Sequence, residues 1–97
     1  MDRRGDVLQI LKTLKPELAR RYHVKSLGLF GSLVRGEQTA TSDVDILVEF
    51  EAPVGFFQFL ELEEYLGERL GQKVDLVSKK ALKPQIGRRI LQEVVPV

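Results

Sequence analysis

The sequence predicts an α+β domain in which one sheet packs against helices and leaves its other face partly open. Two observations lead to this fold class. Apolar residues recur every three or four positions in three segments, and three shorter segments have the length and pattern of strands. Because 97 residues suffice for one two-layer core, we expect a single domain over residues 1–97.

Three segments have the spacing of amphipathic helices. The first contains Pro16, which would either kink the helix or divide it in two. Gly71 directly follows the second and supplies a helix stop. The long helices are expected at residues 4–22, 56–70 and 84–95, with a single helical turn at residues 33–36.

Apolar residues of the last two helices support these predictions. The start of the second helix carries three phenylalanines that could serve the core or a contact surface, and the core is the expected use. The last helix has apolar residues at steps of four. These residues are Phe56, Phe57 and Phe59 in the second helix, and Ile86, Ile90 and Val94 in the last.

Three strands and a loop complete the predicted elements. Residues 24–30 form an apolar run of strand length, and residues 73–77 form another. Residues 43–50 alternate between apolar and mainly acidic positions, which is the pattern of a half-buried strand. Residues 37–42 are polar and rich in threonine, which indicates a loop.

Two aspartates occupy the strand with the clearest alternation, although this residue type is disfavoured in strands. Asp43 and Asp45 are two residues apart, so their side chains project from the same face, about 6–7 Å apart. The opposite, apolar face must be the buried one. Neighbouring carboxylates repel unless a cation lies between them, and a hard ion such as Mg²⁺ takes oxygen ligands. The pair alone would also suit a turn at a strand entry.

Asp75 lies in the middle of the third strand. If that strand lies beside the second, Asp75 would complete a cluster of three carboxylates. Such a cluster could hold two metal ions about 3.5–4 Å apart, which clamp the attacking and leaving oxygens of a phosphoryl transfer. The alternative is that Asp75 is an exposed residue on an edge strand.

Gly31 and Ser32 follow the first strand and open the helical turn. Glycine allows close backbone approach, amides at such a turn point at anions, and serine adds a hydroxyl donor. Alone, Gly-Ser is also a common loop dipeptide. Combined with Asp43 and Asp45, it supplies a phosphate-binding turn and a metal-binding strand, the two halves needed to hold a nucleoside triphosphate with Mg²⁺.

The segment GSLVRGEQTATSDVDILV resembles the signature of the DNA polymerase β-like nucleotidyltransferases, in which Gly-Ser is followed after ten residues by Asp-x-Asp. The residues Arg35-Gly36, and Ser42 ahead of Asp43, are similar to those of the prokaryotic minimal nucleotidyltransferases. The resemblance covers nearly the whole chain. It implies a nucleotidyltransferase core with a small mixed sheet packed on helices.

The resemblance also implies a role for each candidate residue. Gly31 and Ser32 would hold the triphosphate of ATP. Asp43 and Asp45 would ligate Mg²⁺, with two ions expected. Asp75 would ligate the metal nearest the acceptor hydroxyl and help to deprotonate that hydroxyl. Catalysis would then come from positioning and charge neutralisation, without a covalent intermediate.

We also expect particular roles for Arg35 and His23. Arg35 would either contact phosphate or anchor the turn to acidic neighbours, and both roles stay open. His23, the one histidine, lies just before the first strand and is expected to be structural.

The resemblance further implies a partner and an activity. Minimal nucleotidyltransferases are often paired with a HEPN-domain toxin, so we expect a hetero-oligomer in which this chain is the antitoxin. It would transfer AMP from ATP to a hydroxyl of the toxin, with tyrosine as the expected acceptor. The alternative is an antitoxin that neutralises its partner by binding, without catalysis.

Two other classes of function are less well supported. Enzymes that modify a small acceptor, such as the aminoglycoside nucleotidyltransferases, carry an additional helical domain that these residues do not provide. A nucleic-acid binder is disfavoured, since the seven aromatic residues are not interleaved with basic ones and the middle of the chain is acidic.

The composition indicates the cellular compartment of the protein. No apolar run approaches the roughly eighteen residues that a membrane span needs, and the polar N-terminus does not resemble a secretion signal. The absence of cysteine excludes disulfides and thiolate metal sites. We therefore expect a cytoplasmic protein with no membrane partner.

Overall fold

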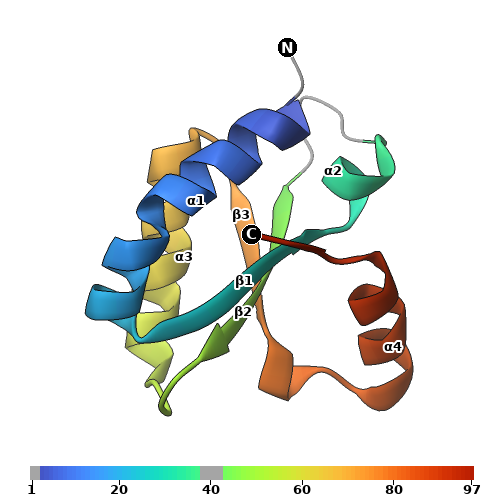
Figure 1. The fold of residues 1–97 in the computed structure, drawn as a ribbon. Helices are drawn as coiled ribbons and strands as arrows, with labels where there is room; N and C mark the ends of the chain where they lie inside the picture. Colours follow the sequence, from blue (N-terminus) through green and yellow to red (C-terminus); the bar gives the residue numbers. More distant parts are fainter. Residues whose placement is uncertain (1–2, 38–42) are drawn as a thin grey trace.

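The computed structural model describes residues 3–37 and 43–97 and shows a four-stranded mixed sheet with helices on both faces (Figure 1). The strand order is β3-β2-β1-β4, with β2 antiparallel to β1 and parallel to β3. This confirms the predicted α+β class with a mixed sheet. The elements are α1 (Arg3–Tyr22), β1 (Val24–Phe30), α2 (Ser32–Arg35), β2 (Val44–Phe50), α3 (Phe56–Leu70), β3 (Val74–Ser78), a 3₁₀ turn η1 (Lys79–Ala81), α4 (Pro84–Glu93) and β4 (Val95–Pro96).

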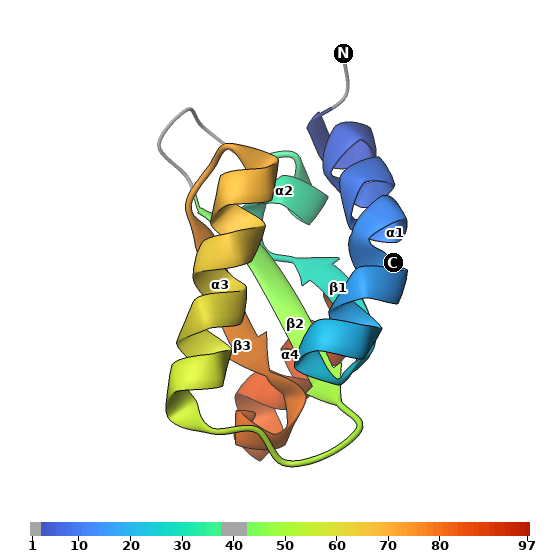
Figure 2. The same ribbon diagram turned by 90° about the vertical axis from the view of Figure 1, so that its left-hand side faces the viewer.

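Helices α1 and α3 cover one face of the sheet, and the core lies between them and the strands (Figure 2). The alternating face of β2 is buried as predicted, because Val44, Ile46 and Val48 have no exposed surface. Helix α1 is continuous, and Pro16 lies on its exposed side. No helix in the described part of the chain is long and apolar enough to cross a membrane. Most of the predicted loop, including Ser42, lies outside the described residues.

The C-terminal segment differs from the prediction of one helix over residues 84–95. Helix α4 ends at Glu93, and Val95–Pro96 form β4, which pairs with β1. The free edge of β1 offers unpaired backbone groups, valine favours strands, and a proline without an N–H is tolerated on an edge strand. Gly28 makes this docking possible, because a Cβ at that position would overlap the Val94 side chain.

The prediction that Phe56 and Phe57 belong to the core was wrong. Their exposed fractions are 70% and 83%, whereas Phe59 is partly buried and packs against the core. Both residues lie off the stripe that α3 buries, which is formed by Leu62, Leu66 and Leu70. The rings of Phe56 and Phe57 contact each other edge to face, with centroids 5.8 Å apart, at the start of the helix.

Candidate active site

The chain turns at Gly31, between β1 and α2, in a conformation that is essentially restricted to glycine. Its φ is 78° and its ψ is −153°. A Cβ at this position would overlap the carboxylate of Asp45, with its Cγ only 2.8 Å away. Glycine is therefore required both by the backbone and by the side chain beside it. The turn and the acidic strand, predicted as two separate halves of a site, are in direct contact.

The register of the sheet brings two predicted carboxylates together. Strands β2 and β3 are parallel neighbours in which Asp45 is paired with Asp75. Paired residues on adjacent strands project from the same face, and neighbouring strands lie about 4.8 Å apart. Asp43 immediately precedes β2, and Asp43 and Asp45 are partly buried while Asp75 is exposed. The third strand therefore lies beside the second, which was the condition for a cluster of three carboxylates.

The carboxyl group of Asp45 is electrostatically unfavourable as an anion. Burial and the nearby charges of Asp75 and Asp43 raise its pKa from 3.8 to about 6, while Arg35 opposes the shift. A cation would relieve this repulsion, and carboxylate oxygens are the ligands that Mg²⁺ prefers. Among residues 3–37 and 43–97, no three histidine, cysteine, aspartate or glutamate side chains lie close enough together to hold a metal ion. The donor chemistry therefore suits Mg²⁺, provided that the carboxylates reorient around it.

Arg35 is anchored by two carboxylates. Its Nη1 donates a hydrogen bond to Glu93 Oε1 at 2.7 Å, and its Nε donates to Glu37 Oε1. The other oxygen of Glu93 accepts a hydrogen bond from the amide of Gly31 at 2.9 Å. Arg35 thus contacts acidic neighbours in the structure, and contact with phosphate stays a prediction. These hydrogen bonds hold the pKa of Glu93 below its ordinary value.

A cavity of about 320 Å³ separates this turn from α4. Helix α4 presents residues 86, 89, 90 and 93 to the cavity, and this spacing places them on one helical face. Ile86 and Ile90 therefore line the site and are not part of the core. The lining consists of Phe30, Gly31, Arg35 and Asp45 on the sheet side and Ile86, Arg89, Ile90 and Glu93 on α4.

Three of the six predicted site residues thus line the cavity, namely Gly31, Arg35 and Asp45. Ser32, Asp43 and Asp75 are not among its lining residues. Glu93 and Arg89 were missed by the sequence analysis. The only signal for them was their position on the same helical face as Ile86 and Ile90.

Comparison with known proteins identifies the family. Residues 11–97 match the family described as nucleotidyltransferase domain. The chain belongs to this family. The nucleotidyltransferase is 50% identical over 92 residues to the protein adenylyltransferase MntA of Thermococcus cleftensis, and the match covers 95% of this chain and 93% of that protein.

Solved structures share the fold of this nucleotidyltransferase. A structure assigned as a minimal nucleotidyltransferase has a TM-score of 0.81 and 32% identity, with 100% of this chain and 97% of that chain covered. A chain from the complex of a tri-AMPylated HEPN toxin with an MNT antitoxin of Shewanella oneidensis has a TM-score of 0.63. That match covers 99% of this chain and 71% of the other, and at 19% identity it shows the fold alone.

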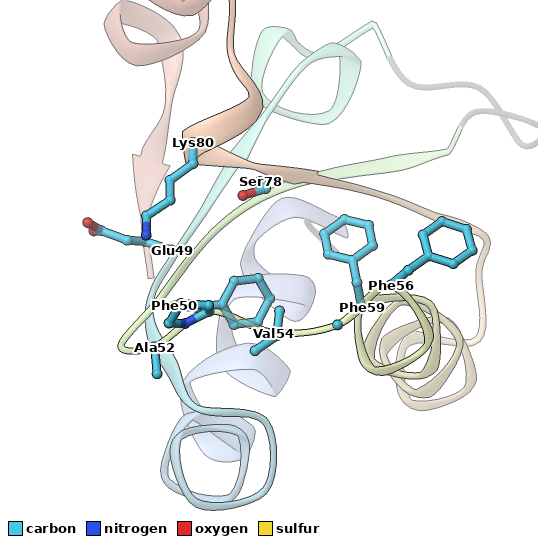
Figure 3. A pocket seen from close by; sticks show the side chains of 10 residues that line it. Glu49, Phe50, Ala52, Val54, Phe56, Phe59, Ser78 and Lys80 are labelled. Atoms are coloured by element: carbon cyan, nitrogen blue, oxygen red, sulfur yellow. The ribbon is translucent and has the colours of Figure 1, made fainter.

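The nucleotidyltransferase has a second cavity, of about 360 Å³, at the opposite end of β2 (Figure 3). Phe50, Val54 and Phe59 form much of its wall, and Lys80 and Glu49 lie at its margin. None of the six predicted site residues lines it. Although it is the larger of the two cavities, it has neither the glycine turn nor the aspartates, so the first cavity is the candidate active site.

Proposed function

We propose that this chain is a Mg²⁺-dependent antitoxin that transfers AMP from ATP to a hydroxyl, expected to be a tyrosine hydroxyl, of a HEPN-domain toxin. One observation carries the proposal: Asp45, which is paired with Asp75 on the neighbouring strand, lies against the Gly31 turn, and both Asp45 and Gly31 line one cavity. Membership of the nucleotidyltransferase family supports the reaction. The name of the Thermococcus relative supports a protein acceptor, and the Shewanella complex supports a HEPN toxin as the partner. The reaction would take place in the cytoplasm.

In this proposal the residues have distinct tasks. Gly31, Ser32 and Arg35 bind the triphosphate, through the amides at the start of α2, which have no acceptor within the helix, and through the guanidinium of Arg35. Asp43, Asp45 and Asp75 hold Mg²⁺, which when bound neutralises charge on the attacking and leaving oxygens. The acceptor oxygen forms a bond to the α-phosphorus, the bond to the bridging oxygen breaks, and pyrophosphate leaves. The exposed carboxylate of Asp75 receives the hydroxyl proton.

The position of the radioactive label tests the reaction type. The toxin is incubated with this chain, Mg²⁺ and ATP that carries ³²P on either the α- or the γ-phosphate. Nucleotidyl transfer predicts that only the α-label becomes attached to the toxin, because the γ-phosphate departs in pyrophosphate. Label from the γ-phosphate on the toxin would indicate phosphoryl transfer, and no label from either ATP would contradict catalysis on this partner.

Neutralisation by binding alone is the second candidate, and an observation on the surface favours it. Phe56 and Phe57 expose most of their surface side by side, and exposed apolar patches are typical of protein contacts. The Asp45→Asn variant separates the two candidates. If the variant still inhibits the toxin as well as the wild type does, binding suffices.

The Mg²⁺ requirement should depend on pH through Asp45. Since its pKa is raised to about 6, the metal-free folded protein keeps this proton up to about pH 6, and Mg²⁺ must displace it below that pH. The Mg²⁺ concentration for half-maximal transfer should therefore rise up to about tenfold for each pH unit below 6. Titrations of Mg²⁺ at several pH values measure this rise. A requirement that is constant from pH 5 to 7 would show that Asp45 is not a ligand.

Replacing Asp75 with alanine should mainly lower turnover. Its proposed task is to prepare the attacking hydroxyl, and proton transfer by a positioned group contributes roughly 10²–10⁴-fold to a rate. We expect kcat to fall by at least about 100-fold, with a smaller change in the KM for ATP. The control is Ser78→Ala at the end of the same strand. Unchanged turnover would make Asp75 an ordinary edge-strand residue.

A further inference from the structure

The carboxylate of Glu93 bridges two donors that the proposed function assigns to phosphate. One oxygen accepts the Gly31 amide at 2.9 Å, and the other accepts the Arg35 guanidinium at 2.7 Å. The Glu93 side chain is only 23% exposed, and it lines the cavity with Asp45. An acidic side chain thus occupies the anion position of the site.

A phosphate group and this carboxylate have the same requirements. Both are anions whose oxygens accept charge-assisted hydrogen bonds from arginine and from backbone amides. The Gly31 amide carries one hydrogen, so it cannot be donated fully to both acceptors. Glu93 also adds negative charge beside Asp45, which would repel a triphosphate. Nucleotide binding through Gly31 and Arg35 therefore requires that Glu93 leave them.

The surroundings of Glu93 permit its side chain to move away from Gly31 and Arg35. Helix α4 lies on the opposite side of the sheet from α1 and α3 (Figure 1), and Gly87 is its only buried residue. The Arg89 guanidinium is four positions earlier on the same helix and faces the same cavity. Residues at this spacing are neighbours on a helix surface, and an ion pair between them stabilises the helix. A rotation of the Glu93 side chain toward Arg89 would free both donors without unfolding α4.

We propose that Glu93 occupies a phosphate position in the nucleotide-free protein and is exchanged for the triphosphate when ATP binds. Glu93 thereby sets the affinity for nucleotide, with Arg89 as the partner of the released carboxylate. This inference rests on the proposed function, because it assumes that ATP binds at Gly31 and Arg35.

Equilibrium binding of ATP, measured with Mg²⁺ and with EDTA, tests the exchange. Glu93→Gln removes the charge but keeps the shape, so we expect it to bind ATP about five- to tenfold more tightly than the wild type. Glu37→Gln is the matched control, because Glu37 also bonds Arg35 but contacts neither Gly31 nor the cavity. Its affinity should stay within about twofold of the wild type. Adenosine, which has no phosphate, should bind the wild type and Glu93→Gln equally.

The outcomes separate this inference from the proposed function. If the wild type binds ATP and modifies the toxin, but folded Glu93→Gln binds ATP no more tightly, Glu93 is only a brace for Arg35 and the exchange is wrong. If the wild type binds no ATP, the proposed function fails and the inference fails with it. Should Glu93→Gln not fold, Glu93→Asp serves instead, since its shorter side chain cannot bridge both donors and should also strengthen ATP binding.

Discussion

Replacing Asp45 with asparagine should abolish AMP transfer and at the same time make the folded protein more stable. The loss of activity follows from its proposed role as a metal ligand beside the Gly31 turn. Metal ions contribute several kcal/mol to such transition states, so we expect transfer to fall by at least about 1,000-fold. Asp43→Ala should have a similar effect on transfer, measured as toxin labelled per unit time.

The gain in stability has a separate cause. The raised pKa means that the ionised Asp45 destabilises the metal-free fold at neutral pH. Because the group is only partly buried, we expect asparagine to raise the free energy of unfolding by on the order of 1 kcal/mol, or about 4–8 °C in Tm. Glu61→Gln, on the exposed side of α3, is the control and should change neither property. A variant that is less stable than the wild type, or that retains transfer, would refute the assignment.

Replacing Gly31 with alanine should damage both the fold and the reaction. The backbone conformation at this position costs a non-glycine residue about 1–3 kcal/mol, and the new Cβ would also overlap the Asp45 carboxylate. We therefore expect the free energy of unfolding to fall by about 2–4 kcal/mol. Since small displacements of reacting groups can cost about 100-fold in rate, transfer should fall at least that far. Urea denaturation and the labelling assay measure the two effects.

A variant at a second glycine, Gly36, distinguishes the cost of backbone strain from the cost of the overlap with Asp45. Gly36 also has a positive φ, 73°, but a Cβ there would meet nothing within 4 Å. Gly36→Ala should cost only about 1–2 kcal/mol of stability and leave transfer near the wild-type rate. In a double-mutant cycle, the destabilisation from Gly31→Ala should be smaller in an Asp45→Ala background. Additive effects would show that the two residues are not in contact.

The sheet and the acidic strand could be predicted because their signals are local. The alternation around Ile46 identifies the buried face of β2, and the apolar run around Asp75 identifies a third strand. That the third strand lies beside β2 comes from the structure. The pairing of Asp45 with Asp75 is a matter of register, which follows once one face must be buried. The direct contact between Gly31 and Asp45 was not predictable, because it depends on the arrangement of two strands in space.

The C-terminal part of the site could not be predicted from periodicity. An apolar stripe on α4 has the same spacing whether it enters a core or lines a cavity, and Ile86 does the latter with 57% of its surface exposed. The hydrogen bonds of Glu93 join residues 62 and 58 positions apart in the chain. The exposure of Phe57, in contrast, agrees with the sequence pattern, since this residue lies off the stripe of leucines that α3 buries.

Intact-mass spectrometry of the HEPN toxin, after incubation with this chain, ATP and Mg²⁺, tests the proposed AMP transfer directly. We predict a gain of one or more AMP units on the toxin, and no gain when Asp45→Asn replaces the wild type. Fragmentation would then identify the acceptor, for which we expect tyrosine. An unchanged mass, with the toxin nevertheless inhibited in a stable complex, would contradict the adenylyltransferase proposal and favour neutralisation by binding.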